Sequence, residues 1–281
     1  MMQSVKLNNG IEMSMVGFGV YQVSDEETEK AVLQALQAGY RLIDTAAVYG
    51  NEAGVGRAIK ASGIPREEIF VTTKLWIQRE NGYEGTQKAL DESLQRLGLD
   101  YVDLYLMHQP FGDVHQEWRA MEDAYKAGKA RAIGVSNFHM DRVMDLVTCH
   151  DIVPAVNQIE THPFYQREDE VAFHKELSIV QQAWGPLAEG KFEIFSNPVL
   201  GKIAAKHGKS VAQVVLRWLN QRGVAIIPKS VKLERIIENR DLFGFELDAQ
   251  DLADIATINT NTAIFDHRDP KMIKWLAEVR G

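Results

Sequence analysis

The sequence predicts an α/β protein built as a closed (β/α)8 (TIM) barrel, with an N-terminal β-hairpin and extra C-terminal helices. Eight short, β-rich apolar runs alternate along the chain with segments of helical spacing. Their midpoints recur at intervals of about 25 to 33 residues, the length of one strand plus one crossover helix. No Pro/Gly/Ser-rich linker divides the 281 residues, so a single barrel domain over residues 1–281 is expected.

The hairpin is predicted around Asn9-Gly10, a dipeptide that tolerates the positive φ of tight turns, within the alternating segment VKLNNGIEM. The eight strand candidates follow between Met15 and Pro228: MVGFGV, RLIDT, IFVTTKL, VDLYLM, RAIGV, AVNQ, IVQQA and AIIP.

Helical spacing fills the intervals, and several of these segments begin with Ser, Asp or early acids and end in Gly, the residues that satisfy helix ends. Clear cases are DEETEKAVLQALQA, GTQKALDESLQRLG, VHQEWRAMEDAYKAG and SVAQVVLRWLNQ. The last interval is longer because residues 185–209 hold an insertion. Two further helical segments, AQDLADIATI and PKMIKWLAEV, follow the eighth strand and are expected to pack across one end or side of the barrel.

An open, doubly wound sheet is the alternative fold. Its usual dinucleotide fingerprint, G-x-G-x-x-G after the first strand, is missing, because GFGVYQV carries only the first two glycines. The count of eight strand and helix units without a central break favours the closed barrel.

Composition limits the partners. With 31 Lys and Arg against 39 Asp and Glu, the net charge is −8, which disfavours binding to nucleic acid or an anionic membrane. The opening MMQSVKLNNG lacks the pattern of a signal peptide, and Cys149 is the single cysteine. A cytoplasmic, monomeric protein that acts on a small molecule is expected.

Polar or aromatic residues stand at the ends of seven of the eight strand candidates: Asp44, Lys74, His108, Ser136 with Asn137, Gln158, Trp184, and Lys229 with Ser230. The C-terminal strand ends of such a barrel meet at one mouth, where its chemistry takes place. Alternation supports this, because Leu42 shares a face with Asp44 and Leu106 shares one with His108. We therefore expect Asp44, Tyr49, Lys74 and His108 to gather there.

The residue types favour two chemistries. The eight His residues form neither His-x-His nor H-E-x-x-H, so no metal site is predicted, and a glycosidase would need a second carboxylate near Asp44. Lys74 is either the Schiff-base nucleophile of an aldolase or a protonated neighbour that lowers the pKa of Tyr49. Asp44 favours the second chemistry, because a carboxylate partner raises the pKa of a lysine.

Longer stretches resemble the aldo-keto reductase family: GFGVYQV, YRLIDTAAVYGNEAGVG, FVTTKLW, LGLDYVDLYLMHQP, GKARAIGVSNF, VNQIETHPF, AWGPLAEGK and IPKSVKLERIIEN. They occur in family order, from the first strand to beyond the eighth. Within the family, the sequence is most similar to the compact bacterial 2,5-diketo-D-gluconate and glyoxal (methylglyoxal) reductases.

The resemblance implies NADPH-dependent reduction of aldehydes or ketones without a metal. It implies that Tyr49 donates the proton, Lys74 lowers its pKa, Asp44 pairs with Lys74 and His108 orients the carbonyl. It also implies NADPH contacts, with Ser136, Asn137 and Gln158 at the carboxamide, Trp184 at the nicotinamide ring, Leu187 along the pyrophosphate, Lys229, Ser230 and Arg235 at the ribose phosphate, and Glu238 and Asn239 near adenine.

Apart from the resemblance, the charge of the IPKSVKLER segment together with its position favours NADPH over NADH, the alternative being a solvated helix start. Lys229, Lys232 and Arg235 form a basic cluster in an acidic protein, beside a serine hydroxyl that suits a phosphate monoester. The cluster follows the eighth strand, where barrels often bind phosphate.

Two positions depart from common family forms. Gln109 replaces a frequent Trp after the catalytic His, which favours short polar dicarbonyls or oxidised sugars, and Gly185 replaces a frequent Ser. The pocket is expected to be lined by Tyr21, Trp76, Gln109 and Phe111. The predicted substrates are small α-dicarbonyls, keto sugars, and aromatic or aliphatic aldehydes.

The sequence leaves two rival functions open, a Schiff-base aldolase on the same barrel and a non-catalytic nucleotide-sensing subunit. The presence of all four catalytic-type residues weighs against the second.

Overall fold

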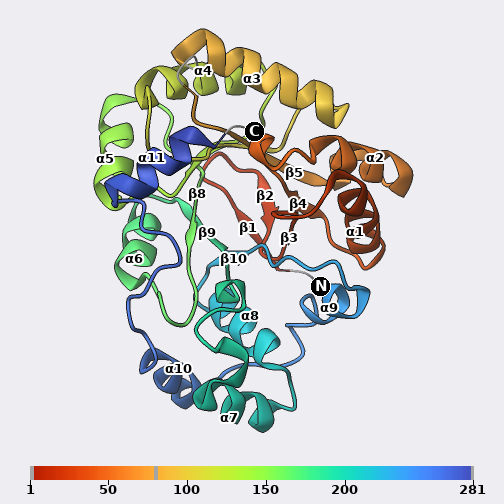
Figure 1. The fold of residues 1–281 in the computed structure, drawn as a ribbon, viewed down its shortest axis with the longest axis vertical. Coiled ribbons are helices and arrows are strands. Elements are labelled where there is room, and N and C mark those ends of the chain that lie inside the picture. Colours follow the sequence, from red (N-terminus) through yellow and green to blue (C-terminus); the bar gives the residue numbers. More distant parts are fainter. Residues whose placement is uncertain (1–2, 79–81, 280–281) are drawn as a thin grey trace.

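In the computed structural model, which describes residues 3–78 and 82–279, eight parallel strands pair in chain order around a barrel (Figure 1). The strands are β3 (Phe18–Gly19), β4 (Leu42–Asp44), β5 (Phe70–Leu75), β6 (Leu104–Met107), β7 (Ile133–Ser136), β8 (Val156–Glu160), β9 (Val180–Trp184) and β10 (Ala225–Ile226). The two edges join, because the Gly17 N–H donates to the Ile226 carbonyl at 2.8 Å and the Ile226 N–H donates to the Met15 carbonyl at 2.9 Å. The predicted closed barrel is confirmed, and the open sheet is wrong.

Closure depends on two glycines in the first strand segment. A Cβ atom on Gly17 would lie 2.2 Å from Cδ2 of Leu42, and one on Gly19 would lie 2.9 Å from the Ile227 carbonyl oxygen. Real Cβ atoms do not approach other atoms so closely. The glycines of MVGFGV therefore serve close packing of the first strand against its neighbours.

The predicted hairpin consists of β1 (Ser4–Lys6) and β2 (Glu12–Ser14), which pair antiparallel. Gly10 takes a φ of +89° in its turn. Leu7 and Met13 from the hairpin are buried in the same apolar cluster as Leu42 and Leu104 of the strands. Alternate strand residues thus fill the barrel interior, with the hairpin packed against it.

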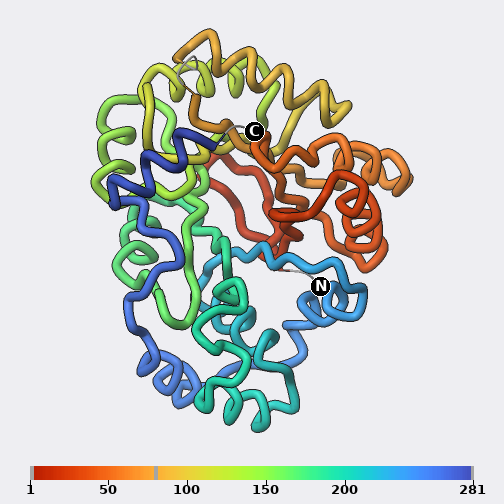
Figure 2. The backbone as a smooth tube through the Cα atoms, in the orientation of Figure 1, coloured from red at the N-terminus to blue at the C-terminus, as the bar shows by residue number. Residues whose placement is uncertain are grey.

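Helices surround the barrel (Figures 1 and 2). They are α1 (Asp25–Gln37), α2 (Glu52–Ser62), α3 (Gly82–Leu97), α4 (Val114–Lys126), α5 (Met140–Cys149), α6 (Glu168–Glu176), α7 (Pro198–His207), α8 (Val211–Gln221), α9 (Leu233–Glu238), α10 (Ala249–Ala256) and α11 (Pro270–Glu278). Short 3-10 turns lie at η1 (Ala47–Tyr49), η2 (Arg66–Glu68), η3 (Ala188–Gly190) and η4 (Ile194–Ser196). The six helical segments quoted from the sequence above all form helices, and each helix begins and ends within three residues of the predicted bounds.

The two extra helices take different places. α10 packs beside α7 of the insertion, where Asp251 accepts hydrogen bonds from Lys206 at 2.8 Å and from His207 at 2.7 Å. α11 lies near the C-terminal strand ends, where the Trp76 Nε1–H donates to the Val279 carbonyl at 2.8 Å. Within the described residues, no helix has both the length and the apolar character needed to cross a membrane.

Candidate active site

A cavity of about 890 Å³ lies at the C-terminal strand ends. Its wall includes fifteen of the eighteen predicted site residues: Tyr21, Asp44, Tyr49, Trp76, His108, Gln109, Ser136, Asn137, Gln158, Trp184, Leu187, Lys229, Arg235, Glu238 and Asn239. Three predicted residues are not on the wall, namely Lys74, Phe111 and Ser230. Phe111 is half-buried and follows Gln109, which is on the wall, by two residues.

Lys74 and Asp44 form a buried pair beneath the cavity. The Lys74 Nζ donates to Asp44 Oδ1 at 2.5 Å and to the Thr45 carbonyl at 2.8 Å, and neither side chain is more than 2% exposed. Burial lowers the pKa of Lys74 and raises the pKa of Asp44, and the opposite charge of each partner counters both changes. Because Lys74 is enclosed and its ammonium is held by two oxygens, the Schiff-base alternative loses support.

The phenol of Tyr49 lies over this pair. The Lys74 Nζ is 5.0 Å from the centroid of the Tyr49 ring, and the rings of Tyr21 and His108 lie 5.0 and 5.7 Å from it. Burial raises the pKa of Tyr49 well above its ordinary value, and the Asp44 carboxylate and Tyr21 raise it further. The pKa of Tyr49 is thus raised rather than lowered as predicted, because desolvation and the Asp44 carboxylate both disfavour the phenolate.

His108 is neutral at pH 7. Burial lowers its pKa well below the ordinary value, and Lys74 and His267 lower it further. Its ring packs edge-on against Trp76, with 4.9 Å between centroids. Among the described residues its Nδ1 has no hydrogen-bond partner. A neutral imidazole in this position is a hydrogen-bond donor rather than a cation.

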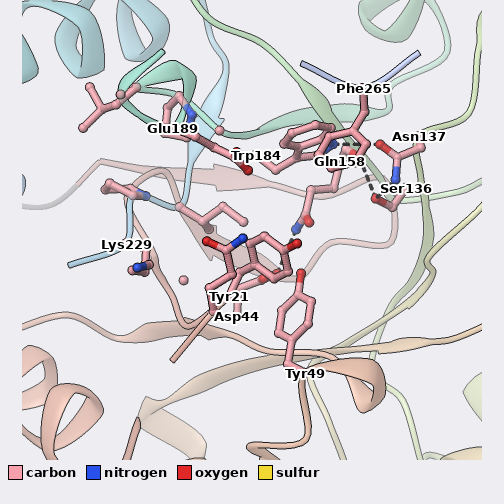
Figure 3. A pocket seen from close by; sticks show the side chains of 18 of the residues that line it. Tyr21, Asp44, Tyr49, Ser136, Asn137, Gln158, Trp184, Glu189, Lys229 and Phe265 are labelled. Atoms are coloured by element: carbon pink, nitrogen blue, oxygen red, sulfur yellow. Dashed lines mark hydrogen bonds between the residues drawn. The ribbon is translucent and has the colours of Figure 1, made fainter. Parts of the chain in front are cut away.

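A hydrogen-bonded group of amides and a hydroxyl occupies the opposite side of the mouth (Figure 3). The Gln158 Nε2 donates to Asp44 Oδ2 at 2.8 Å, which ties this group to the buried pair. The Ser136 hydroxyl donates to the Gln158 carbonyl at 2.8 Å, and the Asn137 Nδ2 donates to the His108 carbonyl at 3.0 Å. The Trp184 Nε1–H donates to Asn137 Oδ1 at 2.7 Å, which fixes the orientation of the indole.

The basic cluster lies at the other end of the cavity. Lys229, Lys232 and Arg235 are exposed, and none forms an ion pair with a described carboxylate. Lys229 and Arg235 line the cavity, and Figure 3 shows Lys229 on the same side as Glu189, away from Asn137. Ser230 is instead used locally, because its Oγ accepts the Lys232 N–H at 3.1 Å. Free cations of this kind suit an anionic group such as a phosphate.

Sequence reasoning missed the contribution of the C-terminal segment, which adds Phe265, His267, Trp275, Leu276 and Val279 to the wall. Aromatic residues at 265 and 275 in a polar stretch were the available signal. Among the described residues, no group of three or more His, Cys, Asp or Glu side chains is placed to hold a metal ion.

A closed parallel barrel with a Tyr, Lys, Asp and His group at its mouth and free cations beside it fits the class that the sequence resemblance implies, a barrel oxidoreductase. Comparison with known proteins gives the same class. Residues 13–260 match the model of the aldo/keto reductase family, and the chain belongs to that family. The predicted enzyme class, a reductase of carbonyl compounds that uses NADPH, is confirmed.

The chain is 48% identical to glyoxal reductase of Bacillus subtilis (strain 168), an alignment that covers 95% of this chain and 96% of the relative. It is 46% identical to morphine 6-dehydrogenase of Pseudomonas putida, with 92% of each chain covered. Among solved structures, an aldo-keto reductase of Bombyx mori in complex with NADP superposes with a TM-score of 0.90 at 39% identity, covering 96% of this chain and 97% of that chain.

Proposed function

We propose that this enzyme reduces small uncharged aldehydes and α-dicarbonyls with NADPH, and that Tyr49 is the proton donor. The observation that carries the proposal is the stack of Asp44, Lys74 and Tyr49 beside neutral His108. Lys74 lies beneath a cavity that the other three line and that also reaches the free cations Lys229 and Arg235. Residues of this kind suit a reaction in which negative charge forms on an oxygen atom.

Each side chain of the site has its own role in the reduction. NADPH, when bound, supplies the hydride. Tyr49 holds its proton at neutral pH, as a phenol with an ordinary pKa near 10 already does, and it transfers this proton to the oxygen that becomes the alcohol. The phenolate that remains faces the Lys74 ammonium, which stabilises the new charge. Neutral His108 donates an N–H to the same oxygen and orients the carbonyl.

The cofactor is proposed to extend along the cavity from the amides to the cations. Ser136, Asn137 and Gln158 would hold the nicotinamide carboxamide and Trp184 its ring, with Leu187 beside the pyrophosphate. Lys229 and Arg235 would bind the ribose phosphate, and Glu238 and Asn239 would lie near adenine. Ser230 would act through the turn that it stabilises, since its hydroxyl already accepts the Lys232 N–H.

The charge of the wall supports uncharged substrates. On the side of Tyr49 the wall is aromatic, and its two histidines are neutral, since burial lowers the pKa of His108 well below its usual value and that of His267 to about 4. No free cation faces this side among the residues that the structure describes. A carboxylate on the substrate would therefore lose water without gaining a partner.

A matched substrate pair tests this point. We expect 4-methylbenzaldehyde to be reduced with a kcat/KM at least tenfold higher than 4-carboxybenzaldehyde, because a para methyl group and a para carboxylate both change the reactivity of the carbonyl little, so that the two differ mainly in charge. Methylglyoxal should likewise be preferred over keto acids. Equal efficiency for the charged and uncharged aldehydes would show that the wall binds anions.

The proton donor is tested with Tyr49→Phe. Loss of the phenol should lower kcat by about 10²- to 10⁴-fold, the usual contribution of a positioned acid, while the Kd for NADPH stays within about twofold. Tyr83→Phe, in α3 outside this cavity, is the matched control and should keep full activity. Full turnover by Tyr49→Phe would contradict the assignment.

We further propose that the enzyme is a single-domain cytoplasmic monomer that binds neither nucleic acid nor membrane. The net charge of −8 and the single free thiol of Cys149 support this proposal. Light scattering of the purified protein should give a mass near 31.7 kDa.

A further inference from the structure

We infer that Glu160 is a positioning residue that holds the C-terminal segment, residues 263–279, against Trp184 and thereby shapes the carbonyl side of the cavity. The contacts that define this role do not depend on the proposed function. Only the kinetic consequence rests on the proposed function.

Glu160 is the last residue of β8, and it is only 4% exposed. Its Oε1 accepts the backbone N–H of Ile264 at 2.5 Å, and its Oε2 accepts the backbone N–H of Phe265 at 3.2 Å. Two consecutive amides of a segment about one hundred residues further along the chain thus bind the two oxygens of one buried carboxylate. Hydrogen bonds to an ionised acceptor are stronger than those to a neutral one.

His162 fixes the carboxylate from the other side. Its Nδ1 accepts the Phe164 N–H at 3.3 Å, so the ring proton lies on Nε2, which donates to Glu160 Oε1 at 2.9 Å. His162 is fully buried. The orientation of Glu160 is therefore set by the body of the barrel, and the C-terminal segment binds to a preformed acceptor.

The segment held in this way packs on the indole of Trp184. The Phe265 and His267 rings lie edge-on to Trp184, with centroid distances of 6.1 and 6.3 Å. Trp184 is also the direct neighbour of Glu160 in the β8–β9 register. A Cβ on Gly185 would lie 3.7 Å from the Ile264 side chain, so the segment runs over the end of β9 as well.

The segment is fastened at its other end by the hydrogen bond from Trp76 Nε1 to the Val279 carbonyl. Between these two attachments, α11 crosses near the mouth (Figure 1), and the segment supplies five residues to the cavity wall. Loss of the Glu160 contacts would release the end that carries Phe265 and His267, and it would leave Tyr49, Lys74 and His108 in place.

The first test measures backbone amide exchange in the intact enzyme without any ligand. In Glu160→Gln, the amides of Ile264 and Phe265 should exchange at least tenfold faster, while amides of α1 and of the barrel strands keep their rates. Glu168→Gln is the matched control, because Glu168 lies eight positions away and is a largely exposed carboxylate paired with Arg222. Unchanged exchange at 264 and 265 in a folded Glu160→Gln would overturn the inference.

The second test separates positioning from general destabilisation. In Glu160→Gln, the KM for an uncharged aldehyde should rise at least fivefold while kcat stays within about twofold. Phe265→Ala should raise KM similarly, and the double variant should be no worse than the worse single variant, because both changes remove one wall. A fall in kcat alone, or fully additive increases in KM, would contradict the role.

If Glu160→Gln does not fold, Ile264→Pro removes one donor and leaves β8 unchanged, and it should give the same increase in KM. An unchanged KM in a folded Ile264→Pro would overturn the role. The two proposals fail separately. Faster exchange at 264 and 265 in an enzyme that reduces no carbonyl would refute the proposed substrates but keep Glu160 as the attachment. Normal exchange at 264 and 265 in an active Glu160→Gln variant would refute the attachment but keep the proposed substrates.

Discussion

Asp44 and Lys74 project from adjacent strands into the barrel, where their charged atoms meet at 2.5 Å with almost no exposure. The register sets this contact. Asp44 lies opposite Thr72, so Lys74 is two residues further along β5 on the same inward face. A parallel barrel thus places a cation and an anion directly below the phenol of Tyr49.

This pair predicts a clear pattern in stability. Lys74→Met leaves the Asp44 carboxylate buried without its partner, so the free energy of unfolding should fall by about 3–5 kcal/mol. In the double variant Asp44→Asn with Lys74→Met, both charges are gone, and much of that loss should be recovered. Urea denaturation at pH 7 measures both.

The matched control for this cycle is the exposed pair of Lys88 and Glu92 in α3, separated by 3.6 Å. Lys88→Met should change the free energy of unfolding by less than about 1 kcal/mol, because surface pairs contribute little. A Lys74→Met variant as stable as the wild type would mean that the buried pair is not ionised.

The basic cluster predicts discrimination between cofactors. Arg235→Ala should weaken NADPH binding by about 10- to 100-fold, the loss of one or two charge-assisted hydrogen bonds, and should leave NADH nearly unaffected. Fluorescence titration with each nucleotide measures this difference. Lys202→Ala, in α7 and paired with Asp254 at 3.6 Å, is a control that should bind both nucleotides normally. Equal losses of affinity for NADPH and NADH would show that Arg235 does not bind the ribose phosphate.

Much of the barrel could be predicted because its signals are local. Alternation placed Leu42 and Asp44 on one face, and Asn9-Gly10 marked the hairpin turn, so the strand ends and their mouth followed. These patterns depend on strand geometry, which the sequence carries directly.

Other features depend on contacts between distant parts of the chain. The pKa of Tyr49 rises because burial and the nearby Asp44 carboxylate disfavour the phenolate, and no motif contains either effect. Likewise, Glu160 binds the amides of Ile264 and Phe265, and backbone donors have no sequence signature. The sequence could not decide whether α11 packs across the mouth or on a side of the barrel, because its position also depends on contacts between distant parts of the chain.

Gln109 gives a prediction about substrate polarity. It lines the cavity at only 5% exposure, and its Oε1 has no hydrogen-bond partner among the described residues. Gln109→Met removes an amide whose buried oxygen is unpaired, at similar volume, so the melting temperature should stay the same or rise. If the amide serves polar substrates, kcat/KM should fall for methylglyoxal and stay level for benzaldehyde. A parallel fall for both aldehydes would argue for a change in cavity shape.

His174 predicts a loss of stability in acid. It is 1% exposed in α6, and its Nε2 accepts from the Asn157 amide at 3.0 Å while its Nδ1 donates to Gln181 Oε1 at 3.0 Å. Burial lowers its pKa to about 4. Between that value and the ordinary pKa near 6.5, the unfolded chain binds more protons than the native protein, so the free energy of unfolding must fall as the pH is lowered. For this one residue the fall from pH 7 to pH 4.5 is roughly 2 kcal/mol.

The measurement is urea denaturation of wild type and His174→Gln at both pH values. The variant cannot titrate, so its loss between pH 7 and pH 4.5 should be smaller than that of wild type by about that amount. It should still lose some stability, because burial also lowers the pKa of His139 and of His267 to about 4. His115→Gln, an exchange at a partly exposed site on α4, should leave the larger acid loss intact. If wild type and His174→Gln lost the same free energy in acid, His174 would have to be protonated with equal ease in the folded and unfolded chains, which its two hydrogen bonds and its burial argue against.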